Sequence, residues 1–287
     1  ITSRLVGSEM CIRDSEELVQ RPDTHPMSHL AGWMADYGFA SARIGYESDS
    51  YFFSPRALDC LRSGLPGAEF VDADLLVNWQ RLVKSDAEIE MMRGAARIAE
   101  ATMQCAFDGA RPGVRQCDLM AEVVATQVRG TPQRGGDMAA IHPLILAGEA
   151  ATTAHPMWTD APLADGQTIA FELGGCMKRY NVGLARTVHL GTPSDDLRRT
   201  AAAVEEGMAA VMDSLKPGAI AGDVHAAWQR VLDHYGLEKP SRIGYSIGVG
   251  YAPDWGERTL SFRPREATPV PDNAVVHVIL GLSLIHI

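Results

Sequence analysis

Glu172 is the residue whose type and surroundings best suit chemistry on a small ligand. It follows the apolar run TIAF at what reads as the end of a strand, and Gly174 and Gly175 come shortly after it. Because glycine has no side chain, a ligand can approach the backbone closely there. A carboxylate in such a place can activate water, attack an electrophilic carbon, or stabilise a cation. The alternative is an exposed glutamate at a strand end.

A second group of candidate residues lies in the string APDWGERT, which reads as a loop. Asp254 and Glu257 flank Trp255 there, and an aromatic ring beside carboxylates suits a planar cation. The alternative is a solvated loop in which Trp255 anchors the packing. Arg186 can hold a substrate carboxylate through two parallel hydrogen bonds, or it can pair with an acid such as Glu172 for structural reasons.

The spacing of the histidines and of the cysteines does not indicate a site. Five histidines lack the spacing of metal ligands, and we expect them to be structural: His142, His189, His225, His234 and His277. His155, in the string AHPMW, taken alone is also more often structural than catalytic. Four cysteines are scattered without CxxC spacing: Cys60, Cys105, Cys117 and Cys176. We therefore expect neither a zinc site nor a disulfide framework.

Two similar units of helices and strands must position these side chains. Ser85, with a glutamate three residues later, predicts a capped helix that ends before Pro112-Gly113, and Asp118 begins the next helix. The same order recurs from Ser194, with the same interval between Pro-Gly and the following aspartate. Strand-like segments follow each helix pair. Unless the match is due to chance, this internal repeat of roughly 105 residues predicts two α-β halves with a ligand-binding cleft between them.

The ends of the chain read differently from the rest. Residues 4–15 (RLVGSEMCIRDS) and 282–287 (LSLIHI) resemble translated sequencing adapters, and such segments are excluded from fold reasoning. We therefore treat residues 1–15 and 282–287 as non-native. Residues 16–78 then form the C-terminal remnant of an α/β domain, and residues 79–281 form a catalytic domain that is truncated at its C-terminus.

Composition excludes several classes of function. The formal net charge is −10, which argues against binding to a phosphate backbone, because that needs clustered lysine and arginine. Hydrophobic residues make up 46% of the chain, which is enough for a sizeable core. No apolar run reaches the ~18 residues of a membrane helix. We expect a cytoplasmic protein that binds neither nucleic acid nor membranes.

From about residue 80 to 281, the order of the sequence segments resembles that of the creatinase and methionine-aminopeptidase family, also called the pita-bread family. The segments are His155-Pro156, TIAFELGG, YNVGLARTVHLG, a helix, KPG, a helix, GYSIGVGY and AVVHVILG. The resemblance implies an α/β (α+β) pita-bread fold. It has two pseudo-symmetric α-β halves around a curved antiparallel sheet, preceded by the remnant of a creatinase-type N-terminal domain. Within this family the ectoine hydrolases are most similar, through strings such as DTHPM, FELGGCMKRY and YAPDWGERTLSFRP.

The metal-dependent peptidases of this family hold two metal ions with two Asp, one His and two Glu. The resemblance places Glu172 at the first Asp and Gly183 at the second. It places Tyr245 and Ser246 in the region of the His, and Ile279 at the first Glu. A pair of dications needs several anionic oxygens, and one of these four positions keeps a carboxylate. We therefore expect no metal and no other cofactor.

The resemblance to ectoine hydrolases implies hydrolysis of the cyclic amidine ring of ectoine, and it places His155 where creatinase-like enzymes have their acid/base histidine. The implied catalytic residues are Glu172, His155 and Glu257. The implied substrate-binding residues are Asp254, Trp255, Arg186, Tyr245 and Tyr180. We expect a homodimer that acts on a small molecule. Two alternatives stay open: an Xaa-Pro dipeptidase or metallo-aminopeptidase of the same fold, and a non-catalytic module that binds a protein partner.

Overall fold

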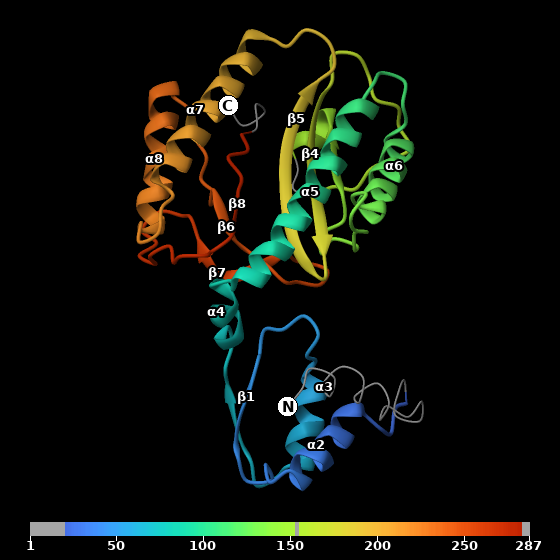
Figure 1. The fold of residues 1–287 in the computed structure, drawn as a ribbon, viewed down its shortest axis with the longest axis vertical. Coiled ribbons are helices and arrows are strands. Elements are labelled where there is room, and N and C mark those ends of the chain that lie inside the picture. The colour runs from blue at the N-terminus through green and yellow to red at the C-terminus, as the bar shows by residue number, and fades with distance from the viewer. Residues whose placement is uncertain (1–20, 153–154, 283–287) are drawn as a thin grey trace. The chain divides into compact units, whose positions relative to one another are not determined.

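The computed structural model describes residues 21–152 and 155–282 and divides the chain after Val77 into two compact units (Figure 1). The expected adapter segment 4–15 lies outside the described residues. Of the string LSLIHI, Leu282 alone is described, and it packs partly buried against the core of the second unit.

The first unit is a small α/β arrangement. Its elements are α2 (Pro26–Asp36), β1 (Arg43–Tyr46), α3 (Pro55–Gly64) and β2 (Glu69–Asp72), and the two strands pair in parallel. Its core is centred on Ala31, Leu61 and Leu65. Ser54 starts α3 because its side chain accepts a hydrogen bond from the backbone N–H of Ala57. This is the α/β character that the sequence had indicated for residues 16–78. The short helix α4 (Leu76–Leu82) follows.

The second unit contains two helix pairs. The first pair is α5 (Asp86–Gly109) with α6 (Gln116–Arg129), and the second is α7 (Asp195–Ser214) with α8 (Ala221–Tyr235). Ser85 and Glu88 form the predicted capping box at the start of α5. The side chain of Ser194 caps α7 in turn, by accepting a hydrogen bond from the N–H of Leu197. Both helix starts that the sequence predicted are therefore confirmed.

Each helix pair is followed by an antiparallel three-stranded sheet. The first sheet has the order β3-β4-β5, formed by β3 (Leu144–Ala147), β4 (Thr168–Met177) and β5 (Tyr180–His189), and the 3-10 turn η2 (Gly148–Thr152) follows β3. The second has the order β7-β6-β8, formed by β6 (Gly244–Ile247), β7 (Gly256–Ser261) and β8 (Val276–Val278). A bridge between Tyr180 and Val249 links β5 to the chain after β6. The internal repeat is thus a pair of α-β halves.

The helices bury one face of each half. Figure 1 shows α5 running along β4 and β5, and Phe171 and Leu173 of β4 pack into a core with residues of α5 and α6. The core of the other half gathers around Trp228 of α8, which is fully buried. Gly207 of α7 allows this contact, because a Cβ there would lie 1.9 Å from the Trp228 ring.

Two local interpretations of the sequence are wrong. Glu172 does not end its strand: β4 continues to Met177, because Gly174 to Met177 pair with the start of β5. The string APDWGERT is not wholly a loop, since Gly256–Ser261 forms β7 and pairs with β6. In both cases pairing with a distant strand sets the element, and the local sequence does not reveal it.

Candidate active site

The hairpin formed by β4 and β5 positions the central carboxylate. Side chains alternate between the two faces of a strand, and Phe171 and Leu173 face the core with α5 and α6. Glu172 therefore lies on the opposite face. It is paired across the hairpin with Ala185, and Gly174 is paired with Gly183 beside it. The carboxylate thus stands next to a patch of bare backbone.

Trp255 fills the space above these two glycines. A Cβ on Gly174 would lie 2.7 Å from Cζ3 of Trp255, and a Cβ on Gly183 would lie 2.8 Å from Cζ2. Both distances are shorter than any ordinary carbon–carbon contact. The indole is almost completely buried, so the two glycines form a cradle for it. The sequence predicted that these glycines leave room for a ligand beside Glu172. In the structure, the Trp255 side chain takes up this room.

Tyr245 and His277 complete an aromatic cluster with Trp255. The indole Nε1 donates a hydrogen bond to the Tyr245 hydroxyl at 3.0 Å. The His277 ring stands edge-on to both other rings, with centroids 5.7 Å from each. Burial raises the pKa of Tyr245, and the carboxylates of Glu172 and Asp254 act in the same direction. The phenol is therefore protonated at neutral pH, and while its oxygen accepts from Trp255 its own O–H can act as a donor.

His277 is a buried neutral imidazole. It is 4% exposed, and burial lowers its pKa to about 4. Neither ring nitrogen has a hydrogen-bond partner within residues 21–152 and 155–282. A Cβ on Gly183 would lie 2.9 Å from its Cε1, so His277 closes the far side of the same cradle.

Glu172 combines partial burial with a perturbed pKa. It is half-buried, and burial raises its pKa, while the nearby charge of His155 acts in the opposite direction. His155 is exposed and has a positive φ of 55°, a conformation that is uncommon for a residue other than glycine. These two side chains, predicted from separate strings, are therefore electrostatic neighbours.

Glu257 lies in a buried ion pair. Both of its carboxylate oxygens are 2.8 Å from Nζ of Lys84, and both side chains are 1% exposed. Burial raises the pKa of Glu257 and lowers the pKa of Lys84, and in each case the partner's charge opposes the shift. Lys84 was not a candidate from the sequence. Its partner is 173 residues away along the chain, and no local pattern indicates such a pair.

Of the other predicted binding residues, Asp254 and Tyr180 are hydrogen-bonded within the protein, and Arg186 lies away from Glu172. Asp254 accepts a hydrogen bond from the N–H of Gly256 at 2.8 Å and so shapes the turn before β7. The hydroxyl of Tyr180 donates to Glu88 at 2.9 Å, and burial followed by this hydrogen bond raises its pKa to about 12. Arg186 is exposed and pairs across the hairpin with Phe171, which puts it on the face opposite Glu172.

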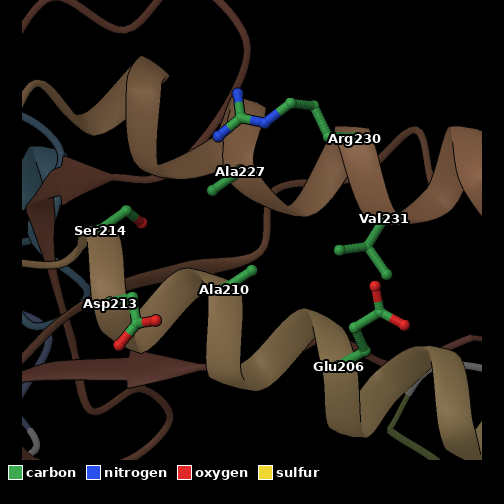
Figure 2. Close-up of a pocket in the computed structure, with 7 residues that line it drawn as sticks. All are labelled: Glu206, Ala210, Asp213, Ser214, Ala227, Arg230 and Val231. Carbon is green, nitrogen blue, oxygen red and sulfur yellow. The ribbon is translucent and has the colours of Figure 1, made fainter.

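A separate hollow of about 390 Å³ lies between α7 and α8. Glu206 and Asp213 of α7 and Arg230 of α8 are among the residues that line it (Figure 2). None of the residues around Glu172 lines this hollow.

Comparison with known proteins identifies the family. Metallopeptidase family M24 matches residues 90–286, which is more than half of the chain. The chain belongs to this family. Ectoine hydrolase from Halomonas elongata is 38% identical over 274 residues, covering 93% of this chain and 69% of that protein. The uncharacterized hydrolase/peptidase y4tM from Sinorhizobium fredii is 37% identical, covering 93% of this chain and 68% of that protein.

Solved structures of the same fold are more distant in sequence. The X-Pro aminopeptidase of Thermotoga maritima has a TM-score of 0.74 at 20% identity, covering 88% of this chain and 68% of that one. Prolidase from Pyrococcus furiosus has a TM-score of 0.75 at 19% identity, covering 88% and 70%. The predicted pita-bread fold is thus confirmed.

The residues of this M24 chain do not fit the paired metal ions that its family suggests. At Gly183 there is no ligand atom and, because Trp255 and His277 approach so closely, no room for a side chain. Ser246 is hydrogen-bonded to Thr259 at 2.9 Å, and the side chain of Ile279 has no atom that could bind a metal. No group of three or more His, Cys, Asp or Glu side chains within the part of the chain that the structure describes is arranged to hold a metal ion. Among the same residues, no helix is long and apolar enough to cross a membrane.

Proposed function

We propose that this protein is a metal-independent hydrolase that opens the ring of a cyclic amidine, with ectoine as the substrate. The observation that carries the proposal is the position of Glu172, a half-buried carboxylate beside the aromatic cluster of Tyr245, Trp255 and His277. This cluster occupies the space that a metal ligand at Gly183 would need. The 38% identity to ectoine hydrolase from Halomonas elongata supports the same substrate.

Ectoine is a six-membered ring that carries an amidinium and a carboxylate. The site presents the carboxylates of Glu172 and Asp254 near Tyr245, and this negative charge favours a cation. Desolvation of Glu172 strengthens its attraction for that cation. The protonated Tyr245 adds a hydrogen-bond donor near Glu172.

In the reaction, the carbon between the two ring nitrogens gains an oxygen and one carbon–nitrogen bond breaks. Glu172 either attacks this carbon directly or removes a proton from the water that does so. His155, close to Glu172 and exposed to solvent, delivers a proton to the nitrogen that departs. The product, after net addition of one water, is an open-chain acetamide with a free amine, an N-acetyl-diaminobutyrate. We further propose that the enzyme works as a homodimer in the cytoplasm.

The test is ring opening of ectoine followed by chromatography. Glu172→Gln keeps the size of the side chain and removes its charge, so turnover should fall on the order of 10³-fold or more while substrate binding falls far less. The matched control is Glu122→Gln, at an exposed position of α6, which should retain normal turnover. Near-normal turnover of Glu172→Gln contradicts the assignment of the carboxylate. A wild-type protein that opens no ectoine but cleaves Xaa-Pro peptides when metal is added contradicts the function.

A further inference from the structure

The ion pair between Lys84 and Glu257 is placed to act on Trp255, and so on the wall beside Glu172. The ammonium group of Lys84 donates three hydrogen bonds inside the protein. Two go to the Glu257 carboxylate at 2.8 Å, and one goes to the carbonyl of Leu82 at 3.0 Å. On the other side, the backbone of Gly248 lies against the carboxylate, because a Cβ there would be 2.4 Å from Oε1 of Glu257. Glu257 is therefore enclosed and has no open side towards a substrate.

The pair also fixes the start of β7. Glu257 is the second residue of that strand and comes two residues after Trp255. Its carbonyl accepts a hydrogen bond from the Asn78 side chain at 2.8 Å. The backbone N–H of Lys84 in turn donates to the carbonyl of Asn273 at 3.1 Å. The segment from α4 to α5 thus holds the strand that begins directly after Trp255.

A small movement of this strand has a direct consequence at the site. Trp255 packs so closely on Gly174 and Gly183 that neither position has room for a Cβ. Its indole N–H donates a hydrogen bond to the Tyr245 hydroxyl. If one charge of the pair is removed, the other is left buried without a partner, and the structure must shift to hydrate it. Such a shift at Glu257 displaces the indole two residues away.

We propose that Lys84 and Glu257 are positioning residues that hold Trp255 against the glycine cradle, and that Glu257 is not the carboxylate that reacts. This inference rests on the proposed function wherever its test measures activity. It differs from the sequence-based expectation that Glu257 is one of the catalytic residues, and the two make opposite predictions for a variant that lacks both charges.

The experiment compares Glu257→Gln, Lys84→Met and the double variant Lys84→Met/Glu257→Met in the whole protein. Displacement of a binding wall by about 1 Å can cost on the order of 100-fold, so each single variant should lose about 10- to 100-fold in kcat/KM. The double variant buries no unpaired charge and should recover most of this loss. Asp118→Asn, which removes an exposed ion pair with Arg115, is the matched control and should change nothing.

A spectroscopic signal separates positioning from general loss of stability. The indole N–H resonance of Trp255 in a ¹H–¹⁵N spectrum, assigned from its loss in Trp255→Phe, should shift in both single variants and return in the double variant. A double variant as inactive as Glu257→Gln, with the indole resonance at its wild-type position, overturns the proposal and makes Glu257 the reacting group. An unshifted resonance in Glu257→Gln overturns it as well. The resonance reads the position of Trp255 even if the protein opens no ectoine, so failure of the proposed function is distinguishable.

Discussion

Gly183→Ala should destabilise the protein by adding a single methyl group to the cradle. The new Cβ would lie 2.8 Å from Trp255 Cζ2, 2.9 Å from His277 Cε1 and 3.1 Å from His277 Nδ1. Neither ring can move away easily, because Trp255 is also pressed against Gly174 and hydrogen-bonded to Tyr245. Overpacking of this kind costs about 1–3 kcal/mol. Loss of backbone freedom in the unfolded chain offsets about 0.4–1 kcal/mol of that cost.

We therefore expect a net loss of roughly 1–2 kcal/mol, measured as a lower urea midpoint with an unchanged slope. The control is Gly135→Ala, where the nearest atom to a new Cβ is 3.9 Å away and the midpoint should not fall. Gly183→Asp introduces the residue that the resemblance to the metal-dependent peptidases places at this position. It should cost more than Gly183→Ala, because a carboxylate is then buried without a partner. Equal midpoints for Gly183→Ala and Gly135→Ala would contradict the close packing of Trp255 and His277 on Gly183.

Three further predictions concern the same unit. The pKa of His277 is about 4 when folded and near 6.5 ordinarily, so the unfolded chain takes up the proton first. The stability that the neutral His277 contributes is complete above pH 6.5 and is lost as the pH falls towards 4, by up to roughly 3 kcal/mol. Urea titrations at several pH values should show this loss. In His277→Phe the free energy of unfolding should depend less on pH. Tyr245→Phe removes the acceptor of the Trp255 indole N–H and should lower the free energy of unfolding by about 1–3 kcal/mol. Ser85→Ala removes the cap of α5 and should cost about 1 kcal/mol in thermal or urea unfolding, whereas the exposed Ser63→Ala should cost little.

The sequence predicted the helices well because their signals are local. Ser85 and Ser194 each cap a helix through hydrogen bonds within four residues, and the Pro-Gly pairs stop the chain from continuing in a helix. Glu172 was also recognisable as a candidate, since an acid in an otherwise apolar strand next to glycines is unusual. Its place in the middle of β4 was not recognisable, because that depends on pairing with β5.

The aromatic cluster and the ion pair were beyond prediction for a physical reason. Trp255 was predicted to contact a ligand, but the structure shows that it packs on Gly174 and Gly183, which are on another hairpin. Lys84 and Glu257 meet across 173 residues, and each has an ordinary local sequence. His277 was expected to be structural, and the sequence carries no sign that it closes the cradle. Long-range contacts of this kind follow from the fold alone.

Turnover of ectoine by protein that has been stripped of metal tests the central claim most directly. The protein is treated with a strong chelator, its metal content is measured by elemental analysis, and ring opening is followed by chromatography before and after divalent metal is added. The arrangement of Glu172 beside Trp255, with Gly183 unable to carry a ligand, predicts full turnover with far less than one metal ion per chain and no gain on addition. Loss of turnover on chelation, restored by about two metal ions per chain, would contradict it.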